Sequence, residues 1–152
     1  MNILVTVGTG SFDTLISSLE EKFRNSVDIK LTIQYGSGNR PSASNSIHDM
    51  FDFKKNIDEL FYEFDLVICH CGAGTVFSLL EKNIPFIAVP NLERVDKHQV
   101  ELAKYLDEMS YSIVCFDVND ISNSILNYKT ENIKKYQKTL FFMADDILDY
   151  LL

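Results

Sequence analysis

The sequence predicts an α/β protein with a parallel sheet that carries helices on both faces. Short apolar runs of strand length alternate with segments whose apolar residues recur at helical spacing, which is the rhythm of β-α-β units. Two of the strands run into glycine-containing turns, at residues 8–10 and 72–74. Six strands in this rhythm indicate a Rossmann-like domain with strand order 3-2-1-4-5-6. Its ligands are expected outside the carboxyl ends of strands one and four.

The first strand and helix are predicted from residues 2–23. Residues 2–7 form an apolar run that ends in Gly8, Thr9 and Gly10. Five apolar residues then fall at i, i+3, i+4, i+7 and i+11, which places them on one face of a helix. They are Phe12, Leu15, Ile16, Leu19 and Phe23.

The second and third strands flank a loop. Residues 28–35 alternate polar and apolar side chains, which predicts a strand with one less-buried face that carries Lys30, Thr32 and Gln34. Residues 36–46 are rich in Gly, Ser, Asn and Pro and are expected to form a loop. Residues 47–53 are predicted to form a short strand, and Asn56 is predicted to cap the helix that follows. The apolar face of that helix would carry Ile57, Leu60, Phe61 and Phe64.

The central stretch is residues 65–75, DLVICHCGAGT. The apolar run at residues 66–69 is too short for a helix and is typical of a buried strand. It breaks at His70 into Gly72, Ala73 and Gly74, and Thr75 is predicted to cap a helix that runs to about residue 83. A strand, a glycine-rich turn and a helix N-terminus form a geometry that binds phosphate, because free backbone N–H groups and the helix dipole point at the ligand.

The remaining chain is predicted to add two strands and three helices. The strands are expected at residues 85–89 and 112–116, and the first two helices at about residues 97–109 and 120–128. The C-terminal helix is predicted from an apolar stripe, most simply explained by core packing, although it could also serve a partner. The stripe consists of Ile133, Tyr136, Leu140, Ala144, Ile147 and Leu151.

Length and charge narrow the class of protein. A chain of 152 residues is expected to form a single domain, residues 1–152. The formal net charge of −8 argues against a general nucleic-acid binder, which needs a basic surface. No apolar run approaches the roughly 18 residues of a membrane span, and the first residues lack a basic signal-peptide region. Three cysteines suit a reducing cytoplasm, and their spacing does not predict a metal site.

Three phosphate signatures are absent. Neither glycine turn has the lysine of a Walker A loop. The dinucleotide fingerprint needs a third glycine, where this chain has Asp13 and Phe77, so no nicotinamide or flavin cofactor is expected. The pair His70-Cys71 begins like a phosphatase loop, but Phe77 stands where the closing arginine would be. Cys71 is therefore interpreted as a packing residue.

Polar residues also follow the two central strands. His70 could be a structural histidine that bridges backbone groups at the strand end, or its imidazole could contact a ligand's phosphate or sugar. Asp96, His98 and Gln99 open the helix after the strand at residues 85–89, so they are expected at the same edge of the sheet. Asp96 is explained by capping, whereas an imidazole and a neutral amide suit hydrogen bonds to sugar hydroxyls.

These segments together resemble a known family. The matching pieces lie at residues 5–16, 31–38, 65–75, 81–90 and 96–106, in the right order. The chain looks like the C-terminal domain of glycosyltransferase family 28. It is similar to the cytosolic donor-binding subunit of the two-subunit UDP-GlcNAc transferase of dolichol-linked oligosaccharide assembly. It is also similar to the C-terminal half of the bacterial peptidoglycan GlcNAc transferase and to bacterial exopolysaccharide transferase subunits.

The resemblance implies the C-terminal half of a GT-B glycosyltransferase, which binds the UDP-sugar donor without a metal. Residues 72–75 would hold the diphosphate, and residues 8–10 would face it. Phe53 and Lys54 occupy positions that flank the uracil. His98 and Gln99 fall where the family contacts the donor sugar, with Asp96 beside them. Ser78 stands where an acidic residue commonly meets the ribose, and Glu81 is nearly a turn further along.

The resemblance also implies a partner. A membrane-anchored subunit would bind the lipid-linked sugar acceptor and recruit this cytoplasmic chain to the membrane, so the chain is expected to be inactive alone. The expected reaction moves GlcNAc from UDP-GlcNAc to a polyprenyl-pyrophosphate-linked sugar. One alternative is a capsule or exopolysaccharide subunit that uses UDP-galactose or UDP-glucose. Another is a non-catalytic UDP-sugar-binding module.

Overall fold

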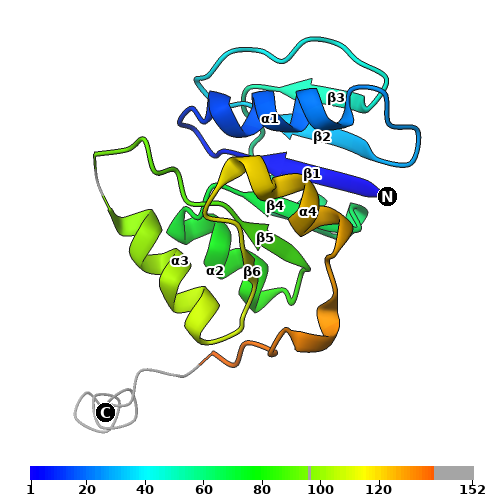
Figure 1. The fold of residues 1–152 in the computed structure, drawn as a ribbon. Coiled ribbons are helices and arrows are strands. Elements are labelled where there is room, and N and C mark those ends of the chain that lie inside the picture. The colour runs from blue at the N-terminus through cyan, green and yellow to red at the C-terminus, as the bar shows by residue number, and fades with distance from the viewer. Residues whose placement is uncertain (96, 139–152) are drawn as a thin grey trace, which may run out of the picture.

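The computed structural model describes residues 1–95 and 97–138. They form one six-stranded sheet in the order β3-β2-β1-β4-β5-β6, and each pair of neighbours is parallel (Figure 1). The strands are β1 (Asn2–Thr6), β2 (Lys30–Gln34), β3 (Ile47–Phe51), β4 (Leu66–Cys69), β5 (Phe86–Ala88) and β6 (Ile113–Val114). The predicted α/β class and strand order are confirmed.

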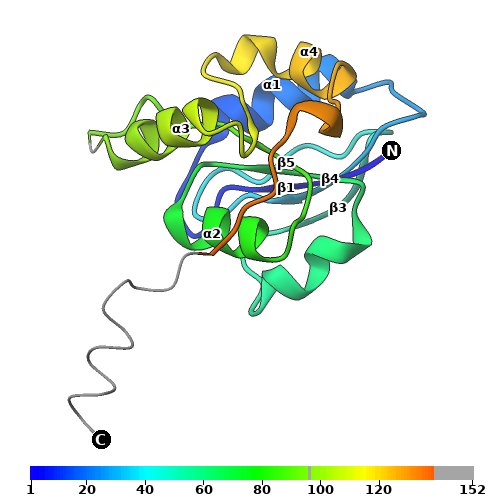
Figure 2. The same cartoon turned by 90° about the horizontal axis from the view of Figure 1, so that it is seen from below.

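Helices cover both faces of the sheet, as the alternating pattern predicts. Four α-helices and three 3₁₀-helices lie among the described residues. They are α1 (Asp13–Phe23), α2 (Ala73–Glu81), α3 (His98–Glu108), α4 (Ile121–Leu126), η1 (Ile57–Glu63), η2 (Val118–Asp120) and η3 (Thr130–Asn132). In Figure 2, α1 and α4 lie on one side of the sheet and α2 lies on the other.

Alternate residues of the central strands feed two separate hydrophobic clusters. Ile3 and Val5 of β1 pack with the buried face of α1 and with α4. Leu4 points the other way and joins a cluster that contains buried residues of η1, α2 and α3. The strands β1 and β4 are paired on both sides, and their residues enter the clusters on both faces of the sheet. Their carboxyl ends are therefore rigid supports for the loops that follow.

The second strand was predicted to have one less-buried face, and this prediction is wrong for two of its three residues. Thr32 and Gln34 are buried, with only 7% and 2% of their surface exposed. The Thr6 hydroxyl donates a 2.5 Å hydrogen bond to Gln34 Oε1, across the paired strands β1 and β2. Polar-apolar alternation does not distinguish a solvated polar side chain from a buried one that has found a partner.

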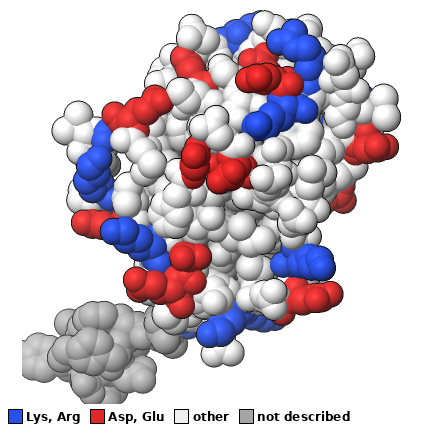
Figure 3. Space-filling view, viewed as in Figure 1, with Lys and Arg blue, Asp and Glu red and all other residues white. Residues whose placement is uncertain are grey.

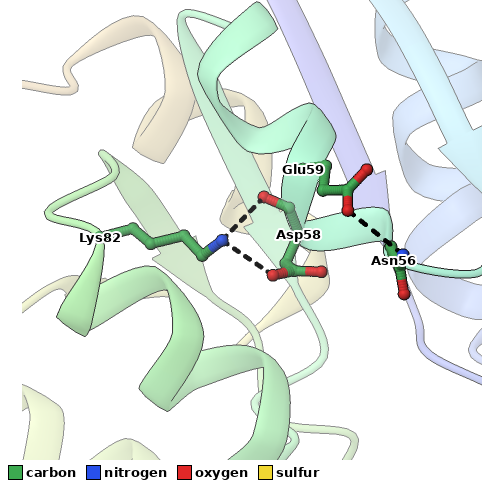
Figure 4. Close-up of polar contacts among 4 residues, drawn as sticks. All are labelled: Asn56, Asp58, Glu59 and Lys82. Atoms are coloured by element: carbon green, nitrogen blue, oxygen red, sulfur yellow. Dashed lines mark hydrogen bonds and ion pairs between the residues drawn. The ribbon is translucent and has the colours of Figure 1, made fainter.

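The segment between β3 and β4 also differs from its prediction. It is the 3₁₀-helix η1, and Asn56 precedes it with a left-handed φ of 56° and no side-chain capping bond. The Asn56 side chain instead donates to Glu59, as Figure 4 shows. Lys82, just after α2, reaches η1 and pairs with the Asp58 carboxylate at 2.8 Å. This bond lowers the pKa of Asp58.

The helix after β4 begins three residues earlier than predicted. Gly72 is the N-cap of α2, and the Val76 N–H donates to the Gly72 carbonyl oxygen at 2.9 Å. Thr75 is therefore inside the first turn and is not the cap. Ala73 and Gly74 also belong to this turn. Gly74 is tolerated in the first turn because the helix is stabilised mainly by the packing of its buried apolar residues further along.

The C-terminal helix is not found where its start was predicted. After η3, residues 133–138 have no regular secondary structure. Ile133 and Tyr136 are half-buried, and Tyr136 packs edge-on against Phe77 and Tyr111. Leu140, Ala144, Ile147 and Leu151 lie outside the described residues. The prediction of a helix is therefore wrong for residues 133–138.

The surface mixes both signs of charge. Figure 3 shows acidic and basic side chains interspersed on the face seen in Figure 1, without a continuous basic band on that face. In the part of the chain that the structure describes, no helix has the length and apolar character required to cross a membrane.

Two loops are locked together at the carboxyl edge of the sheet. Gly36 follows β2 with a left-handed φ of 61°, and a β-carbon there would overlap the Gly10 carbonyl oxygen. The Ser37 N–H donates to that same carbonyl oxygen at 3.0 Å. Further along, both the backbone and the side-chain amide of Asn39 donate to the Asp13 carboxylate. The loop after β2 therefore supports the loop after β1.

We expect Gly36→Ala to destabilise the protein by more than about 1–3 kcal/mol, because left-handed strain is added to a backbone clash. The matched control is Gly74→Ala, where a β-carbon meets nothing within 4 Å and the residue is helical. That change should be neutral or stabilising by up to about 1 kcal/mol. Urea denaturation of the two variants measures both effects, and equal stabilities would contradict the locked-loop interpretation.

Candidate functional site

A small polar pocket lies at the carboxyl edge of the sheet, at the ends of β1, β4 and β5. Its volume is about 200 Å³. The residues that line it are Val7, Thr9, Gly10, Ser11, His70, Asn91, Arg94 and Gln99. Larger hollows exist elsewhere on the described surface, but this one lies at the switch point between β1 and β4, where ligands bind in doubly wound sheets.

The loop after β1 forms one wall of the pocket. Gly8 has a left-handed φ of 69°, and its N–H donates to the Thr6 hydroxyl at 3.3 Å. This turn directs Thr9 and Gly10 into the pocket. Thr9 is exposed and Gly10 is half-buried. Thus Thr9 and Gly10 line the pocket, whereas Gly8 sets the path of the turn and packs against His70.

His70 connects the two glycine turns. A β-carbon on Gly8 would lie 2.8 Å from His70 Cε1, and one on Gly72 would overlap His70 Nε2. The imidazole thus occupies the space that two missing side chains leave. Glycine is required at both positions for a reason that the sequence pattern does not reveal, namely the packing of a histidine ring rather than the approach of a ligand alone.

The surroundings of the His70 ring favour its neutral form. Burial lowers its pKa, and the nearby Arg94 guanidinium lowers it further, while the contact with Thr6 acts in the opposite direction. Nδ1 lies 3.4 Å from the Thr6 carbonyl oxygen. Because a carbonyl oxygen only accepts, this contact places the proton on Nδ1 and leaves the lone pair on Nε2. His70 therefore contacts a backbone group at the strand end, as one of its two predicted roles requires.

The cysteines beside His70 are packing residues, as predicted for Cys71. Cys69 and Cys71 are buried, with 0% and 1% exposed surface. Burial raises the pKa of Cys69 to about 12 and raises the pKa of Cys71 as well. Cys71 adopts a left-handed φ of 62°, which is uncommon for a residue with a side chain. A protonated, buried thiol is a poor nucleophile.

The first turn of α2 starts next to the His70 ring. Its N-cap residue is Gly72, which has no side chain to accept hydrogen bonds from the turn, and no acidic residue lies within the turn. The N–H groups of Ala73, Gly74 and Thr75 precede the first helical hydrogen bond. Ala73 and Gly74 are exposed and Thr75 is half-buried. This helix end presents backbone donors and a positive dipole to an anion. By contrast, the first turn of α1 contains Asp13.

The loop after β5 closes the pocket and is organised by Asn91, which is 6% exposed. Its side-chain nitrogen donates to the Ser11 carbonyl oxygen at 3.2 Å, and its side-chain oxygen accepts from the Glu93 N–H at 3.1 Å. Its own N–H donates to Gln99 Oε1 at 3.0 Å. Gln99 therefore lines the pocket at the expected edge of the sheet, with its side-chain oxygen bound to the loop after β5.

Asn91 and Arg94 were not predicted as site residues. The polar stretch at residues 91–97 has no motif, and only the fold brings it beside Ser11 and His70. A signal was available in principle: an asparagine directly after a strand-ending proline is typical of a turn that organises its own backbone. Arg94 gave no such signal, because a single arginine in a polar loop is usually solvated.

Other predicted residues lie outside the pocket. The His98 side chain is 88% exposed, and its Nδ1 is 3.7 Å from Glu101 Oε2. Phe53 is 61% exposed just after β3, and Lys54 Nζ lies 5.9 Å from the centre of the Phe51 ring. Both follow a strand that ends two residues earlier than predicted. Asp96 lies outside the described residues.

The acidic candidate for a ribose contact is remote. Glu81 is the last residue of α2, about 12 Å along the axis from its first residue. Its carboxylate pairs with Lys138 at 2.8 Å. Ser78 is half-buried in the middle of the helix. Within residues 1–95 and 97–138, no three His, Cys, Asp or Glu side chains are grouped as a metal would require.

Known structures share this fold. The MurG structure from Acinetobacter baumannii superposes with a TM-score of 0.65 at 22% identity, over 83% of this chain and 41% of that one. The solution structure of ALG13 superposes with a TM-score of 0.59 at 20% identity, over 99% of this chain and 94% of that one. Such neighbours are GT-B glycosyltransferases, so the predicted GT-B half is confirmed as a fold.

Sequence relatives agree with the structural ones. The chain is 34% identical to the human UDP-N-acetylglucosamine transferase subunit ALG13 over 122 residues, which is 74% of this chain but 11% of the human protein. It is 32% identical over 89 residues to a Campylobacter jejuni N-acetylglucosamine transferase that acts on pyrophosphoryl-undecaprenol, over 56% of this chain and 26% of that protein. The chain thus spans about a tenth to a quarter of these relatives.

One family of protein domains matches nearly the whole chain. This match is consistent with a ligand pocket at the switch point of the sheet. Residues 2–147 match the glycosyltransferase family 28 C-terminal domain. The predicted resemblance is confirmed, and the chain belongs to the glycosyltransferase family 28 C-terminal domain family.

Proposed function

We propose that this chain is the donor-binding subunit of a glycosyltransferase that moves GlcNAc from UDP-GlcNAc to a polyprenyl-pyrophosphate-linked sugar. The observation that carries this proposal is the position of His70, whose ring packs against Gly72 at the start of α2 and also lines the polar pocket. A nucleotide sugar has an anionic diphosphate beside a hydroxyl-rich ring. The first turn of α2 suits the diphosphate, and the polar pocket suits the hydroxyl groups of the sugar. UDP-GlcNAc as donor is supported by the named activity of the sequence relatives.

In this proposal the donor is divided among three regions. Its diphosphate meets the N–H groups of residues 72–75, with residues 8–10 facing it. The uracil lies against exposed Phe53, with Lys54 at its edge, because an exposed aromatic ring at a ligand edge offers a stacking surface. The sugar meets Gln99 first, with His98 and Asp96 beside it.

His70 has a positioning role and a binding role in this proposal. Its ring holds the two glycine loops at a fixed separation. With the proton on Nδ1, the Nε2 lone pair accepts a hydrogen bond, which suits a hydroxyl of the donor rather than a phosphate oxygen. The choice left open by the sequence, phosphate or sugar, is thus resolved in the proposal toward a hydroxyl.

The acceptor site belongs to a partner in this proposal. The chain spans 41% of the MurG chain, as expected for one of the two halves of a GT-B enzyme. A membrane-anchored subunit would bind the lipid-linked acceptor and recruit this chain to the cytosolic face of a membrane. Ser78 leaves the ribose contact to neutral groups or to backbone.

Two other functions stay open within the same fold. A capsule or exopolysaccharide transferase subunit would use UDP-galactose or UDP-glucose in the same pocket. A non-catalytic module would bind the UDP-sugar and only activate a partner. Donor competition tests the first alternative, and turnover by pocket variants tests the second.

Calorimetric titration of the full chain with UDP, UDP-GlcNAc, UDP-galactose and NAD tests donor binding. We expect binding of UDP species and none of NAD, with UDP-GlcNAc preferred over UDP-galactose. Gln99→Ala should weaken UDP-GlcNAc about 2- to 12-fold, the worth of one hydrogen bond. Gln99→Glu keeps the oxygen that holds Asn91 but removes the amide donor, and Lys104→Ala on α3 is the neutral control. Binding of NAD without UDP would contradict the proposal.

Turnover in the complex separates an enzyme subunit from a binding module. The chain is co-expressed with its membrane partner, and transfer of labelled GlcNAc to a polyprenyl-pyrophosphate-linked sugar is followed. We expect no transfer by the chain alone, and a loss of at least tenfold in the complex for the double variant His98→Ala, Gln99→Ala. Assembly is checked by co-purification. Full turnover in an assembled double variant would favour the binding module.

The protonation state of His70 is directly measurable. Because burial lowers its pKa, we expect its ring to titrate below the ordinary histidine value of 6.5, with the Nδ1–H tautomer at pH 7 in ¹H–¹⁵N spectra. The sign of the stability effect follows: as the pH falls below 6.5, the unfolded chain binds a proton more readily, so stability is lost. A midpoint above 6.5, or the Nε2–H tautomer, would contradict this assignment.

A further inference from the structure

The loop after β5 carries a buried polar residue, Asn91, at the carboxyl edge of the sheet. The loop leaves the sheet at Val89, whose N–H donates to the Cys69 carbonyl oxygen at 2.8 Å. Pro90 follows, and its ring restricts the backbone that leads into Asn91. Asn91 is 6% exposed. Because a buried amide is costly unless its polar atoms are hydrogen-bonded, the contacts of Asn91 indicate what this residue holds in place.

Asn91 joins three segments that meet at the polar pocket. Its side-chain nitrogen donates to the Ser11 carbonyl oxygen at 3.2 Å, and its side-chain oxygen accepts from the Glu93 N–H at 3.1 Å. The second contact is an Asx turn, in which an asparagine organises the backbone two residues further on. Because both ends of the side-chain amide are bonded, the backbone of Asn91 has a fixed orientation. Its N–H donates to Gln99 Oε1 at 3.0 Å.

We propose that Asn91 is a positioning residue, which fixes the side-chain amide of Gln99 and thereby sets the preference of the pocket for one donor sugar over its epimers. This inference rests on the proposed function, since it concerns how the same pocket selects the sugar of UDP-GlcNAc. It goes beyond that function because it names a residue that acts on the donor through Gln99.

The bond to Gln99 determines which hydrogen-bonding group this side chain directs at a ligand. A primary amide has an acceptor oxygen and a donor nitrogen on opposite sides of its carbon. When Oε1 is held by the Asn91 N–H, the direction of Nε2 is fixed as well. Gln99 lines the pocket, so in this proposal its amide acts there as a hydrogen-bond donor of fixed direction.

A fixed donor discriminates between sugars that a rotating donor accepts equally. Epimeric sugars differ only in the direction of one hydroxyl group. An amide that rotates freely follows the hydroxyl of either epimer, whereas an amide held at its oxygen meets a hydroxyl in one direction only. A site built to hydrogen-bond a substrate group rejects an analogue that leaves the polar groups of the site unpaired. Asn91 therefore affects the selection without a contact of its own to the sugar.

The experiment compares UDP, UDP-GlcNAc and its 4-epimer UDP-GalNAc, because UDP has no sugar and the two epimers differ at one hydroxyl. Each is titrated calorimetrically into the full chain and into Asn91→Ala. We expect Asn91→Ala to weaken UDP-GlcNAc about 2- to 12-fold, the worth of one hydrogen bond, and UDP by less than about twofold. The donor ratio, defined as the affinity for UDP-GlcNAc divided by that for UDP-GalNAc, should fall toward one.

A double-variant cycle tests whether Asn91 acts through Gln99. In the Gln99→Ala background, the further change Asn91→Ala should alter the UDP-GlcNAc affinity and the donor ratio by less than about twofold, because the group that it positions is gone. A second readout needs no ligand. The side-chain amide signals of Gln99 in ¹H–¹⁵N spectra, assigned by their loss in Gln99→Ala, should move in Asn91→Ala.

Two further variants separate positioning from stability. Asn91→Ser keeps a hydroxyl that accepts from the Glu93 N–H, although more weakly, and loses the bond to Ser11. It should lower the donor ratio less, and it replaces Asn91→Ala if that variant does not fold. The matched control is Ser112→Ala, which removes the 2.9 Å hydrogen bond from another buried side chain to the Phe86 carbonyl oxygen. Because Phe86 begins β5, at the opposite edge of the sheet, this control should lower stability in urea denaturation and leave the donor ratio unchanged.

The outcomes distinguish the role of Asn91 from the proposed function. An equal donor ratio in wild type and Asn91→Ala overturns the positioning role and leaves the proposed function intact. Additive losses in the double variant, or equal weakening of UDP and UDP-GlcNAc, also overturn it, because Asn91 would then only support the loop. A wild type that binds both epimers equally has no selection for Asn91 to set, which overturns it too. If the wild-type chain, with its partner present, binds none of the uridine compounds, the proposed function fails and the role of Asn91 fails with it.

Discussion

The contact on which the site depends is that of one imidazole ring between two glycines. The His70 ring occupies the space beside Gly8 and Gly72, so the loops after β1 and β4 can approach only because both lack a side chain. The ring is held by the Thr6 carbonyl oxygen, and Thr6 is itself bound to Gln34 in the next strand. The position of the His70 ring in the pocket therefore depends on hydrogen bonds of the central strands. A side chain at either glycine would displace the ring and disturb its contacts with β1, β2 and β4.

A second constraint is electrostatic. The chain carries a formal net charge of −8, yet the first turn of α2 contains no acidic residue. The corresponding acid at α1, Asp13, is bound to Asn39 in the supporting loop. The first turn of α2 is therefore a more favourable position for an anion than the first turn of α1. This arrangement suits the diphosphate of the proposed donor, because the backbone N–H groups of the turn are oriented before a ligand arrives.

Support for the site comes from loops that pack on one another rather than from long elements. The loop after β2 holds the loop after β1 through Gly36 and Gly10, and the loop after β5 holds it from the other side through Asn91. Asn91 is buried, and its backbone and side chain bond to Ser11, Glu93 and Gln99. A pocket that opens at the edge of a sheet needs such bracing because loops carry little hydrophobic packing of their own.

The sequence by itself determined the α/β class and the strand order, and it predicted the edge at which a ligand would bind, because apolar periodicity and right-handed β-α-β connections leave few topologies. It also predicted the family, and it brought Gln99, Gly10 and His70 to one edge. Only the tertiary structure decided where α2 begins, that Gln34 is buried, and that Arg94 faces the pocket. The physical reason is that periodicity reports which residues are removed from water. Helix starts, buried polar pairs and the neighbours of a loop arginine depend on contacts between segments far apart in the chain.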